Sequence, residues 1–582
     1  MQKFWLFILI VFGLFQGHSQ SKVSKDSVFL NQKFIKPMDI PISLAGNFGE
    51  LRPGHFHAGL DIRTQGREGI PVVAIADGVV SRIGVSVYGY GKVLYVDHPN
   101  GYTSVYAHLQ RFEGPIQQKA KAIQYAHKQF QMDTSLAVGI SVKQGQVIGY
   151  SGNTGGSAGP HLHFEIRNTM TENPINPMHF YKSDITDNVV PNISLLSVYP
   201  LNTQSSANHQ SNPLHFKVVK SGRDFVVSGD EIPIINGKIG FGIEVKDYLN
   251  GSSFRNGVYT IELFKNGQKV YAHQMDSFSF DHTRCINSHM DFCESVKSKK
   301  QIQKSFVENG NQLDIYQDLV NNGQLFFMND TVYQMKYVIR DFHGNESVLR
   351  FKVKSTSQVK NTSAEVLYNQ LLKAGQENNF VSDRVKIKWA ESCLYDDLKF
   401  VFGEQPAVGR CKTPRYLIQN RFEPLNDYME LSINIAHLTE DEQSKSVIMS
   451  LDEKSEVIAA EGGKLKNGWI TTKTRSFGPY TVFVDNEAPH LKPINFSANS
   501  NVGKLSELKF SLTDNLSGVA GYEAFLGDEE MTKWILVEYE RNKKTAFIDL
   551  KDVKPTSGLQ KLTLKVVDGV GNTSTEIYPL QF

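Results

Sequence analysis

The stretch that decides the fold and the chemistry is Gly159-Pro160-His161-Leu162-His163-Phe164-Glu165. Polar and apolar residues alternate along it, which is the pattern of a β-strand with one polar and one apolar face. The two imidazoles then point to the same face, about 6–7 Å apart, while Leu162 and Phe164 face the opposite side. The stretch therefore predicts a β-strand with a core face and a functional face that carries two histidines.

Two upstream segments carry further polar groups, namely His57-Ala-Gly-Leu-Asp61 and Tyr106-Ala-His108-Leu109. A catalytic zinc needs three nitrogen or oxygen ligands from the protein and a fourth position for water. On an extended strand His57 and Asp61 would lie about 13 Å apart, so a shared metal requires the chain to turn at Ala58-Gly59. Taken separately, each segment also fits a surface ion pair, a buried structural histidine or a structural metal site.

Taken together, the motifs H-x-x-x-D, Y-A-H-L and G-x-H-L-H-F-E resemble those of the lysostaphin-type zinc endopeptidases, which cut peptide cross-links in bacterial peptidoglycan. The resemblance covers residues 45–170 and includes the intervening stretches 69–78, 89–91 and 142–149. It implies one Zn²⁺ per chain with three ligands: His57, Asp61 and His163. It also implies that His108 and His161 act on the attacking water and on the developing oxyanion, in an order that the sequence leaves open.

The expected chemistry follows from charge. Zinc lowers the pKa of a bound water toward about 7 and polarises the scissile carbonyl. The chain has no H-E-x-x-H motif and so no helical glutamate base. A neutral His108 or His161 can instead accept the proton, and a protonated one can stabilise the oxyanion or assist the leaving amine.

Two glycine-rich segments, residues 86–91 and 151–159, are expected to border the substrate groove. Their small side chains let an extended peptide approach the backbone closely, which suits short cell-wall peptides. The alternative is that both segments are plain flexible turns. The candidate groove residues are Tyr88, Tyr90, Asn153, Gly155 and Gly156.

Two other functions compete with the enzyme. A catalytically silent scaffold or regulator of wall hydrolysis would have lost some of the five polar residues, yet all five are present. A biotinyl or lipoyl carrier-like barrel would explain the β-type runs 72–80 and 142–149. Such a carrier needs an exposed lysine in a tight Met-Lys-Met or Asp-Lys-Ala turn, and residues 45–185 contain neither. The carrier is therefore disfavoured.

The expected fold class is mainly β: an antiparallel β catalytic domain with a helical insertion, followed by immunoglobulin-like β-sandwich modules. The helix formers of residues 117–130 predict the insertion, which serves either as a lid or docking site at the groove or as a packed surface helix. In the packed alternative one face buries Ala120, Ile123, Ala126, His127 and Phe130.

An internal repeat organises the rear of the chain. Asp247 to Gly251 and Asp341 to Asn345 are matched by Asp514 to Gly518 and Asp568 to Asn572, as in two related sandwiches. A short helical piece is expected at residues 364–374. The predicted domains are a signal peptide at 1–20, a zinc peptidase domain at 21–185, β-sandwich modules at 190–355 and 488–582, and a strand-rich module at 356–487.

The first residues, Met-Gln-Lys followed by about twelve apolar residues, read as a secretory signal peptide that is too short to span a membrane. We expect export to the periplasm, the cell envelope or the medium, with no transmembrane segment in the mature chain. The net charge of +2, from 62 basic and 60 acidic residues, gives no reason to expect nucleic acid as a partner. Peptidoglycan peptides are the expected substrate, and the rear β modules are expected to bind wall or protein partners or to act as spacers.

Four cysteines, Cys285, Cys293, Cys393 and Cys411, permit disulfides in an exported chain but fit free thiols equally.

Overall fold

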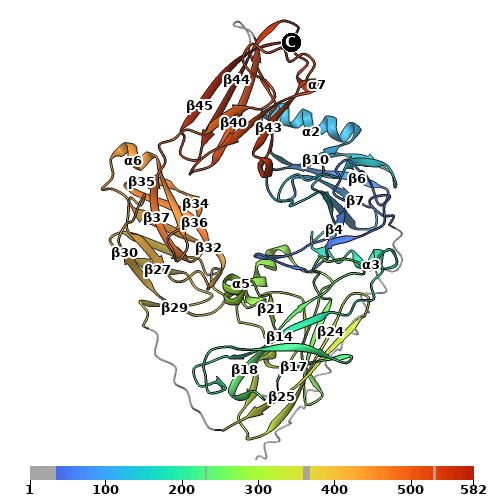
Figure 1. Cartoon of the computed structure of the whole chain (residues 1–582), viewed down its shortest axis with the longest axis vertical. Helices are drawn as coiled ribbons and strands as arrows, with labels where there is room; N and C mark the ends of the chain where they lie inside the picture. Colours follow the sequence, from blue (N-terminus) through green and yellow to red (C-terminus); the bar gives the residue numbers. More distant parts are fainter. Residues whose placement is uncertain (1–33, 230–231, 358–366, 528–531) are drawn as a thin grey trace, which may run out of the picture.

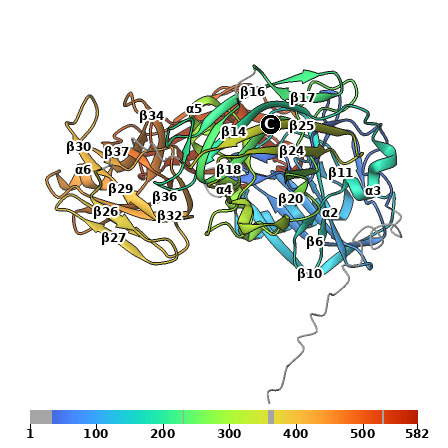
Figure 2. The same cartoon turned by 90° about the horizontal axis from the view of Figure 1, so that it is seen from below.

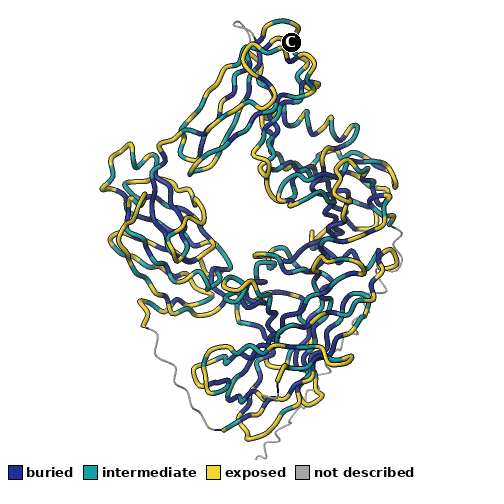
Figure 3. The backbone as a smooth tube through the Cα atoms, in the orientation of Figure 1, coloured by how far each residue is buried: buried dark blue, intermediate teal, exposed yellow. Residues whose placement is uncertain are grey.

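The computed structural model describes residues 34–229, 232–357, 367–527 and 532–582, which fold into four units joined in a ring (Figure 1). The predicted signal peptide at 1–20 lies outside the described residues. Each unit has its own buried core (Figure 3). Seen from below, the third unit stands to one side of the others (Figure 2). We refer to the units, in chain order, as the first, second, third and fourth.

The first unit contains an antiparallel sheet of eight strands in the order β1-β4-β12-β8-β7-β6-β10, with β13 paired to β12. A second sheet has the order β5-β11-β9, and β2 pairs with β3. The elements are β1 (Leu44–Gly46), β2 (Leu51–Arg52), β3 (His55–Phe56), β4 (Leu60–Arg63), β5 (Pro71–Val73), β6 (Gly78–Val85), β7 (Lys92–Asp97), β8 (Tyr102–Ala107), β9 (Arg111–Phe112), α2 (Gly114–His127), β10 (Met132–Val142), β11 (Val147–Tyr150), β12 (His161–Asn168), β13 (Pro174–Ile175), α3 (Met178–Tyr181) and η1 (Lys182–Asp184).

The second unit is built around a 12-stranded sheet. Its elements are β14 (Asn192–Pro200), β15 (Ser206–Ala207), β16 (Leu214–Ser221), β17 (Asp224–Val227), β18 (Ile234–Lys246), β19 (Thr260–Lys265), β20 (Gln268–Gln274), η2 (Phe280–Cys285), α4 (Ile286–His289), α5 (Phe292–Ser298), β21 (Ile302–Lys304), β22 (Tyr316–Leu319), η3 (Asn321–Gly323), β23 (Leu325–Phe327), β24 (Val332–Arg340) and β25 (Glu346–Ser355).

The third unit packs two five-stranded sheets, β27-β28-β32-β36-β35 and β30-β31-β37-β33-β34, around one core. Its elements are β26 (Gln370–Leu372), β27 (Asn378–Val381), β28 (Val385–Trp389), β29 (Leu398–Phe400), β30 (Phe402–Gln405), β31 (Arg415–Ile418), β32 (Pro424–Asn434), α6 (Glu440–Ser444), β33 (Ser446–Leu451), β34 (Val457–Gly462), β35 (Lys464–Lys466), β36 (Trp469–Ser476) and β37 (Gly478–Val484).

The fourth unit packs two four-stranded sheets, β38-β39-β43-β42 and β41-β40-β44-β45. Its elements are β38 (His490–Pro493), β39 (Glu507–Thr513), β40 (Val519–Gly527), β41 (Thr532–Ile535), β42 (Glu538–Glu540), η4 (Arg541–Lys543), β43 (Thr545–Asp549), α7 (Leu550–Val553), β44 (Leu559–Asp568) and β45 (Thr573–Gln581). The mainly β architecture is thus confirmed.

One local prediction is wrong. The helical piece expected at residues 364–374 falls partly outside the described residues, and its described part forms strand β26. Leu372 is fully buried in the core of the third unit, and β26 pairs with β29. Tertiary packing and strand pairing therefore override the local helix preference.

The predicted helical insertion is present as α2, and its buried face agrees in part with the one expected. Ala120 and Phe130 are buried as expected, whereas Ala126 and His127 are exposed. Within the helix, Ile116, Ala120 and Gln124, spaced by four residues, are buried. The stripe at i, i+4 and i+8 packs against the first unit because these residues lie on one helix face. The rest of the helix surface is left for other contacts.

Those contacts are made by the fourth unit, which docks on α2 at the top of the ring (Figure 1). Glu538 of β42 pairs with Lys92 and with Lys121, each at 2.7 Å. Tyr125 of α2 packs edge-on against Trp534, with ring centroids 5.6 Å apart. The insertion is therefore a docking site for another part of its own chain.

Within the described residues, no helix is both long and apolar enough to cross a membrane. All four cysteines are free thiols; Cys285 and Cys393 are buried.

The docking predicts a large effect of Glu538→Gln. Burial opposes the charge on Glu538, but Lys92 and Lys121 outweigh it and hold its pKa at about 2. Removing one partner of a buried ion pair costs about 3–5 kcal/mol, so hydrogen exchange in β42 and α2 should accelerate by at least about 100-fold. Glu540→Gln, which removes an exposed pair with Lys543, is the control and should change exchange only slightly. Equal exchange in the two variants would contradict this docking.

The same pair predicts an acid-sensitive interface. The carboxyl of Glu538 has an ordinary pKa of 4.5 and a pKa of about 2 when docked. Its stabilising contribution is therefore complete above pH 4.5 and is lost as the pH falls toward 2. Hydrogen-exchange rates at β42, divided at each pH by the intrinsic rate of an unprotected amide, should rise as the pH falls through this range in the native chain and stay flat in Glu538→Gln.

Candidate active site

The site is built where β12 lies between β4 and β8. The antiparallel register places His163 opposite Asp61 of β4 and opposite Ala107, the last residue of β8. His57 lies in the short connection before β4, and His108 follows β8 directly. Leu162 and Phe164, on the other face of β12, are fully buried in the core as expected. Strand pairing thus brings together side chains from three distant parts of the sequence.

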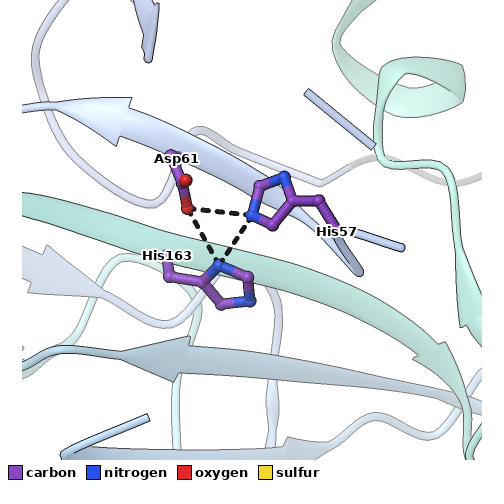
Figure 4. Close-up of side chains that lie close together, drawn as sticks. All are labelled: His57, Asp61 and His163. Carbon is purple, nitrogen blue, oxygen red and sulfur yellow. Dashed lines mark hydrogen bonds and ion pairs between the residues drawn. The ribbon is translucent and has the colours of Figure 1, made fainter. Parts of the chain in front are cut away.

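Three ligand-type atoms converge to a small triangle (Figure 4). His57 Nε2 lies 3.0 Å from Asp61 Oδ1 and 3.0 Å from His163 Nδ1, and the last two atoms are 2.9 Å apart. All three residues are buried. A tetrahedral zinc with bonds of about 2 Å has ligand atoms about 3.3 Å apart, so these atoms need to separate by only a few tenths of an ångström.

Each member of the triangle is oriented by a partner on its far side. His57 Nδ1 donates to the backbone carbonyl of Asn47 at 2.7 Å, which turns Nε2 toward the centre. His163 Nε2 lies 2.8 Å from Glu165 Oε1, and Arg52 Nη2 donates to Asp61 Oδ2 at 2.9 Å. Local sequence patterns do not predict the supporting roles of Asn47 and Arg52. The role of Glu165 could have been predicted, because it lies on the same strand face two residues after His163.

The electrostatics of the triangle favour a positive charge. Burial opposes ionisation of Asp61, yet the neighbouring histidines hold its pKa well below the ordinary value. Burial likewise opposes charge on His163, but hydrogen bonds with Asp61 and Glu165 raise its pKa to about 9. Arg167 and His163 together hold the pKa of Glu165 at about 2 against the effect of burial. The carboxylates therefore remain ionised and attract a cation.

His108 and His161 lie beside the triangle with ring centroids 4.7 Å apart. His108 Nδ1 is 2.8 Å from the carbonyl of Thr154, and His161 Nδ1 is 2.8 Å from the carbonyl of Gly159. Burial first, and the charges of the other histidines second, lower the pKa of His108 to about 3, so its ring is neutral. His108, directly after the end of β8, has φ of +58°, a left-handed backbone conformation that is uncommon for a residue with a side chain.

Gly59 is required by close packing at the turn between His57 and Asp61. A Cβ atom at this position would lie 2.3 Å from the carbonyl oxygen of Phe164. The missing side chain lets the turn press against β12, as the turn expected at Ala58-Gly59 requires.

A pocket of about 800 Å³ surrounds these residues. Of the five predicted groove residues, Tyr90 and Gly156 line it. Three residues of the second unit also line the pocket. Sequence patterns did not predict them as pocket residues, because they lie far along the chain from the three motifs. They are Phe254, Phe280 and Thr283.

The other three groove candidates face the fourth unit. Asn153 and Gly155 line a separate pocket bounded by β42 and β43. Tyr88 lies under the guanidinium of Arg541, 4.6 Å from its ring centroid. Asn542 Nδ2 donates to the backbone carbonyl of Gly155 at 3.1 Å. These residues therefore form the junction between the pocket loops and the fourth unit.

Comparison with known proteins gives two domain matches. Residues 55–177 match Peptidase family M23, and residues 369–485, in the third unit, match the Zu5-like domain.

Two curated relatives each match about a fifth of this chain. The DD-carboxypeptidase/endopeptidase Mpg of Neisseria meningitidis is 36% identical over 128 residues, which are 22% of this chain and 23% of that protein. The glycyl-glycine endopeptidase ALE-1 of Staphylococcus capitis is 35% identical over 118 residues, 20% of this chain and 26% of that protein. The chain thus spans about a quarter of the length of these curated relatives.

Among solved structures, the catalytic domain of lysostaphin from Staphylococcus simulans is 30% identical, covering 23% of this chain and 89% of that chain with a TM-score of 0.18. The family match of residues 55–177 confirms the resemblance predicted from the three motifs, and the chain contains a peptidase family M23 domain there.

Proposed function

We propose that the first unit is a zinc endopeptidase that hydrolyses peptide cross-links of bacterial peptidoglycan. The observation that supports this proposal most directly is the buried triangle of His57, Asp61 and His163, whose three ligand-type atoms lie within 3.0 Å of one another. The names of the relatives support the substrate class, because they describe a DD-carboxypeptidase/endopeptidase and a glycyl-glycine endopeptidase.

The three residues fit zinc in number, type and spacing. Two imidazole nitrogens and one carboxylate oxygen are the ligand set of many catalytic zinc sites, and all three residues line the pocket. When bound, zinc would supply a Lewis acid and a water of lowered pKa. The chain itself contributes the orientation of the ligands through Asn47, Glu165 and Arg52.

His108 and His161 can both handle a proton at the pocket. A carbonyl oxygen only accepts hydrogen bonds, so Thr154 and Gly159 fix the proton of each ring on Nδ1. The opposite nitrogen, Nε2, is then the acceptor in a neutral ring and becomes a donor after protonation. His161 Nε2 lies 3.4 Å from Asp61 Oδ1, beside the triangle. The pair therefore supplies a general base and a donor for the oxyanion or the leaving amine.

The pocket suits an extended peptide. Gly156, which has no side chain, and Tyr90 line the pocket from the first unit, while Phe254 and Phe280 of the second unit add apolar surface to it. Backbone and small side chains bind the peptide main chain, and the aromatic rings contact its side chains.

A catalytically silent scaffold is the second candidate, and the activity measurements below distinguish it from the enzyme. The presence of all five polar residues around one pocket favours catalysis. Export of the chain follows from the same proposal, because peptidoglycan lies outside the cytoplasm, and the signal-like segment at 1–20 supports it. The rear units then act on wall or protein partners.

Replacing Asp61 by Ala tests the metal. We expect the native chain to contain one zinc and to release peptide fragments from purified peptidoglycan, and Asp61→Ala to lose both. Mass analysis of the fragments and of the metal content, with and without a chelator, gives the readout. Asp133→Asn, which removes an exposed pair with Arg82, is the control and should keep both properties. Full zinc occupancy in Asp61→Ala would refute the ligand assignment.

Replacing His108 by Ala separates binding from chemistry. The ring is not part of the triangle, so zinc content should remain unchanged while kcat falls by about 10²–10⁴-fold, the usual contribution of a positioned acid or base. His127→Ala, an exposed histidine on α2, serves as the control. Loss of zinc together with activity would make His108 a ligand, and normal activity would exclude it from the mechanism.

A further inference from the structure

A second set of carboxylates recurs at the same place in the second and fourth units. Asp187-Asn-Val-Val-Pro191 enters the second unit, and Asp485-Asn-Glu-Ala-Pro489 enters the fourth. Each entry segment meets the two turns of the sequence repeat. These turns begin at Asp247 and Asp341 in the second unit and at Asp514 and Asp568 in the fourth.

The hydrogen bonds around the two sets match. Asn345 Nδ2 donates to Asp341 Oδ2 at 2.7 Å and to the backbone carbonyl of Asp187 at 3.2 Å. In the fourth unit, Asn572 Nδ2 donates to Asp568 Oδ2 at 2.7 Å and to the carbonyl of Asp485 at 2.8 Å. The same frame therefore holds the entry segment against the last turn in both units.

The carboxylates are close together, and all of them are buried except that of Asp514, which is half-buried. In the fourth unit, oxygens of Asp485, Asp514 and Asp568 all lie within 4.8 Å of one another. In the second unit, Asp187 and Asp341 are equally close, together with Nδ1 of His343. Among the described residues, no Lys or Arg forms an ion pair with any of the six carboxylates, and the ionisable partner that one of them has is His343, 4.0 Å from Asp187. Buried like charges without a counter-ion are costly.

The second unit also holds unpartnered buried polar atoms, close enough to this cluster that the charges of Asp341 and Asp187 act on Asp247. Asp247 is 2% exposed, and its Oδ1 has no hydrogen-bond partner. Asn256 pairs with Asp247 across the strands through two backbone hydrogen bonds, so the two side chains lie on the same side. Asn256 is 4% exposed, and neither its amide oxygen nor its amide nitrogen has a partner. In the fourth unit Asp514 Oδ1 is likewise buried and unpartnered.

We propose that each of these two units binds one Ca²⁺ between its three repeated aspartates. The ligands are oxygens of Asp187, Asp247, Asp341 and Asn256 in the second unit, and of Asp485, Asp514 and Asp568 in the fourth. Calcium takes six to eight oxygen ligands from carboxylates, amides, carbonyls and water in flexible geometry. His343 is excluded from the shared set because Val570 occupies its place in the fourth unit.

The position of the sites gives them a structural role. Asp187 follows the last helix of the first unit, η1, and Asp485 follows the last strand of the third unit, β37. A cation there ties the incoming segment to the turns of the next unit. Calcium therefore fixes the junction between the first and second units and the junction between the third and fourth units.

Calorimetric titration of calcium into the zinc-loaded full chain tests the proposal. We expect two calcium ions per chain, one in Asp247→Asn, one in Asp514→Asn and none in the double variant. Affinities should lie in the range of extracellular calcium modules, about 10⁻⁴–10⁻³ M. Asp224→Asn, which removes an exposed pair with Arg350, is the control and should keep both sites. No binding in the native chain, or two ions in the double variant, overturns the proposal.

Melting temperatures separate a cation site from a purely structural carboxylate. Without calcium, Asp247→Asn should melt at or above the native temperature, because it removes a buried like charge. With calcium, the native chain should gain several degrees and the variant should gain less. A variant that melts below the native chain to the same extent with and without calcium would overturn the proposal.

Discussion

The candidate site depends on one constraint, the register of β12 between β4 and β8. Because His163 lies opposite both Asp61 and Ala107, a single pairing fixes the carboxylate, the imidazole and the position of His108. A shift by one residue would turn His161 and His163 into the core and bring Leu162 and Phe164 into the pocket. The fully buried apolar face of β12 prevents that shift. The core of the first unit and the geometry of the site are therefore specified by the same strand.

The supports of the site come from beyond the peptidase domain. Asn47, whose carbonyl orients His57, exchanges two hydrogen bonds with Gly257 of the second unit, at 2.8 and 2.7 Å. Arg167, which bonds Glu165, lies 4.5 Å from the ring centroid of Phe280. The second unit thus restrains Asn47, which bonds His57, and Arg167, which bonds the Glu165 partner of His163, and it also lines the pocket. Its removal should loosen the triangle even though it supplies none of the three residues.

The sequence predicted what local patterns determine. Alternation in the stretch around His163 indicated a strand with two faces, and the run of helix formers indicated the insertion at α2. It did not predict contacts between residues far apart in the chain. Leu372 became part of a strand because β29 offered a partner and a core. Tyr88, Asn153 and Gly155 had the composition of a peptide groove, but only the folded chain reveals that the fourth unit lies against them.

Docking of the fourth unit and the shape of the pocket are coupled through one loop. Asn542 donates to the carbonyls of Gly155 and Ser157, and Gly156 between them lines the pocket. The buried pair of Glu538 with two lysines supplies more stabilisation than a surface ion pair because little water screens it. Undocking would release the loop that also holds Nδ1 of His161 through Ser157. Docking of the fourth unit therefore affects the orientation of the His161 ring, although the fourth unit contributes no atom to the triangle.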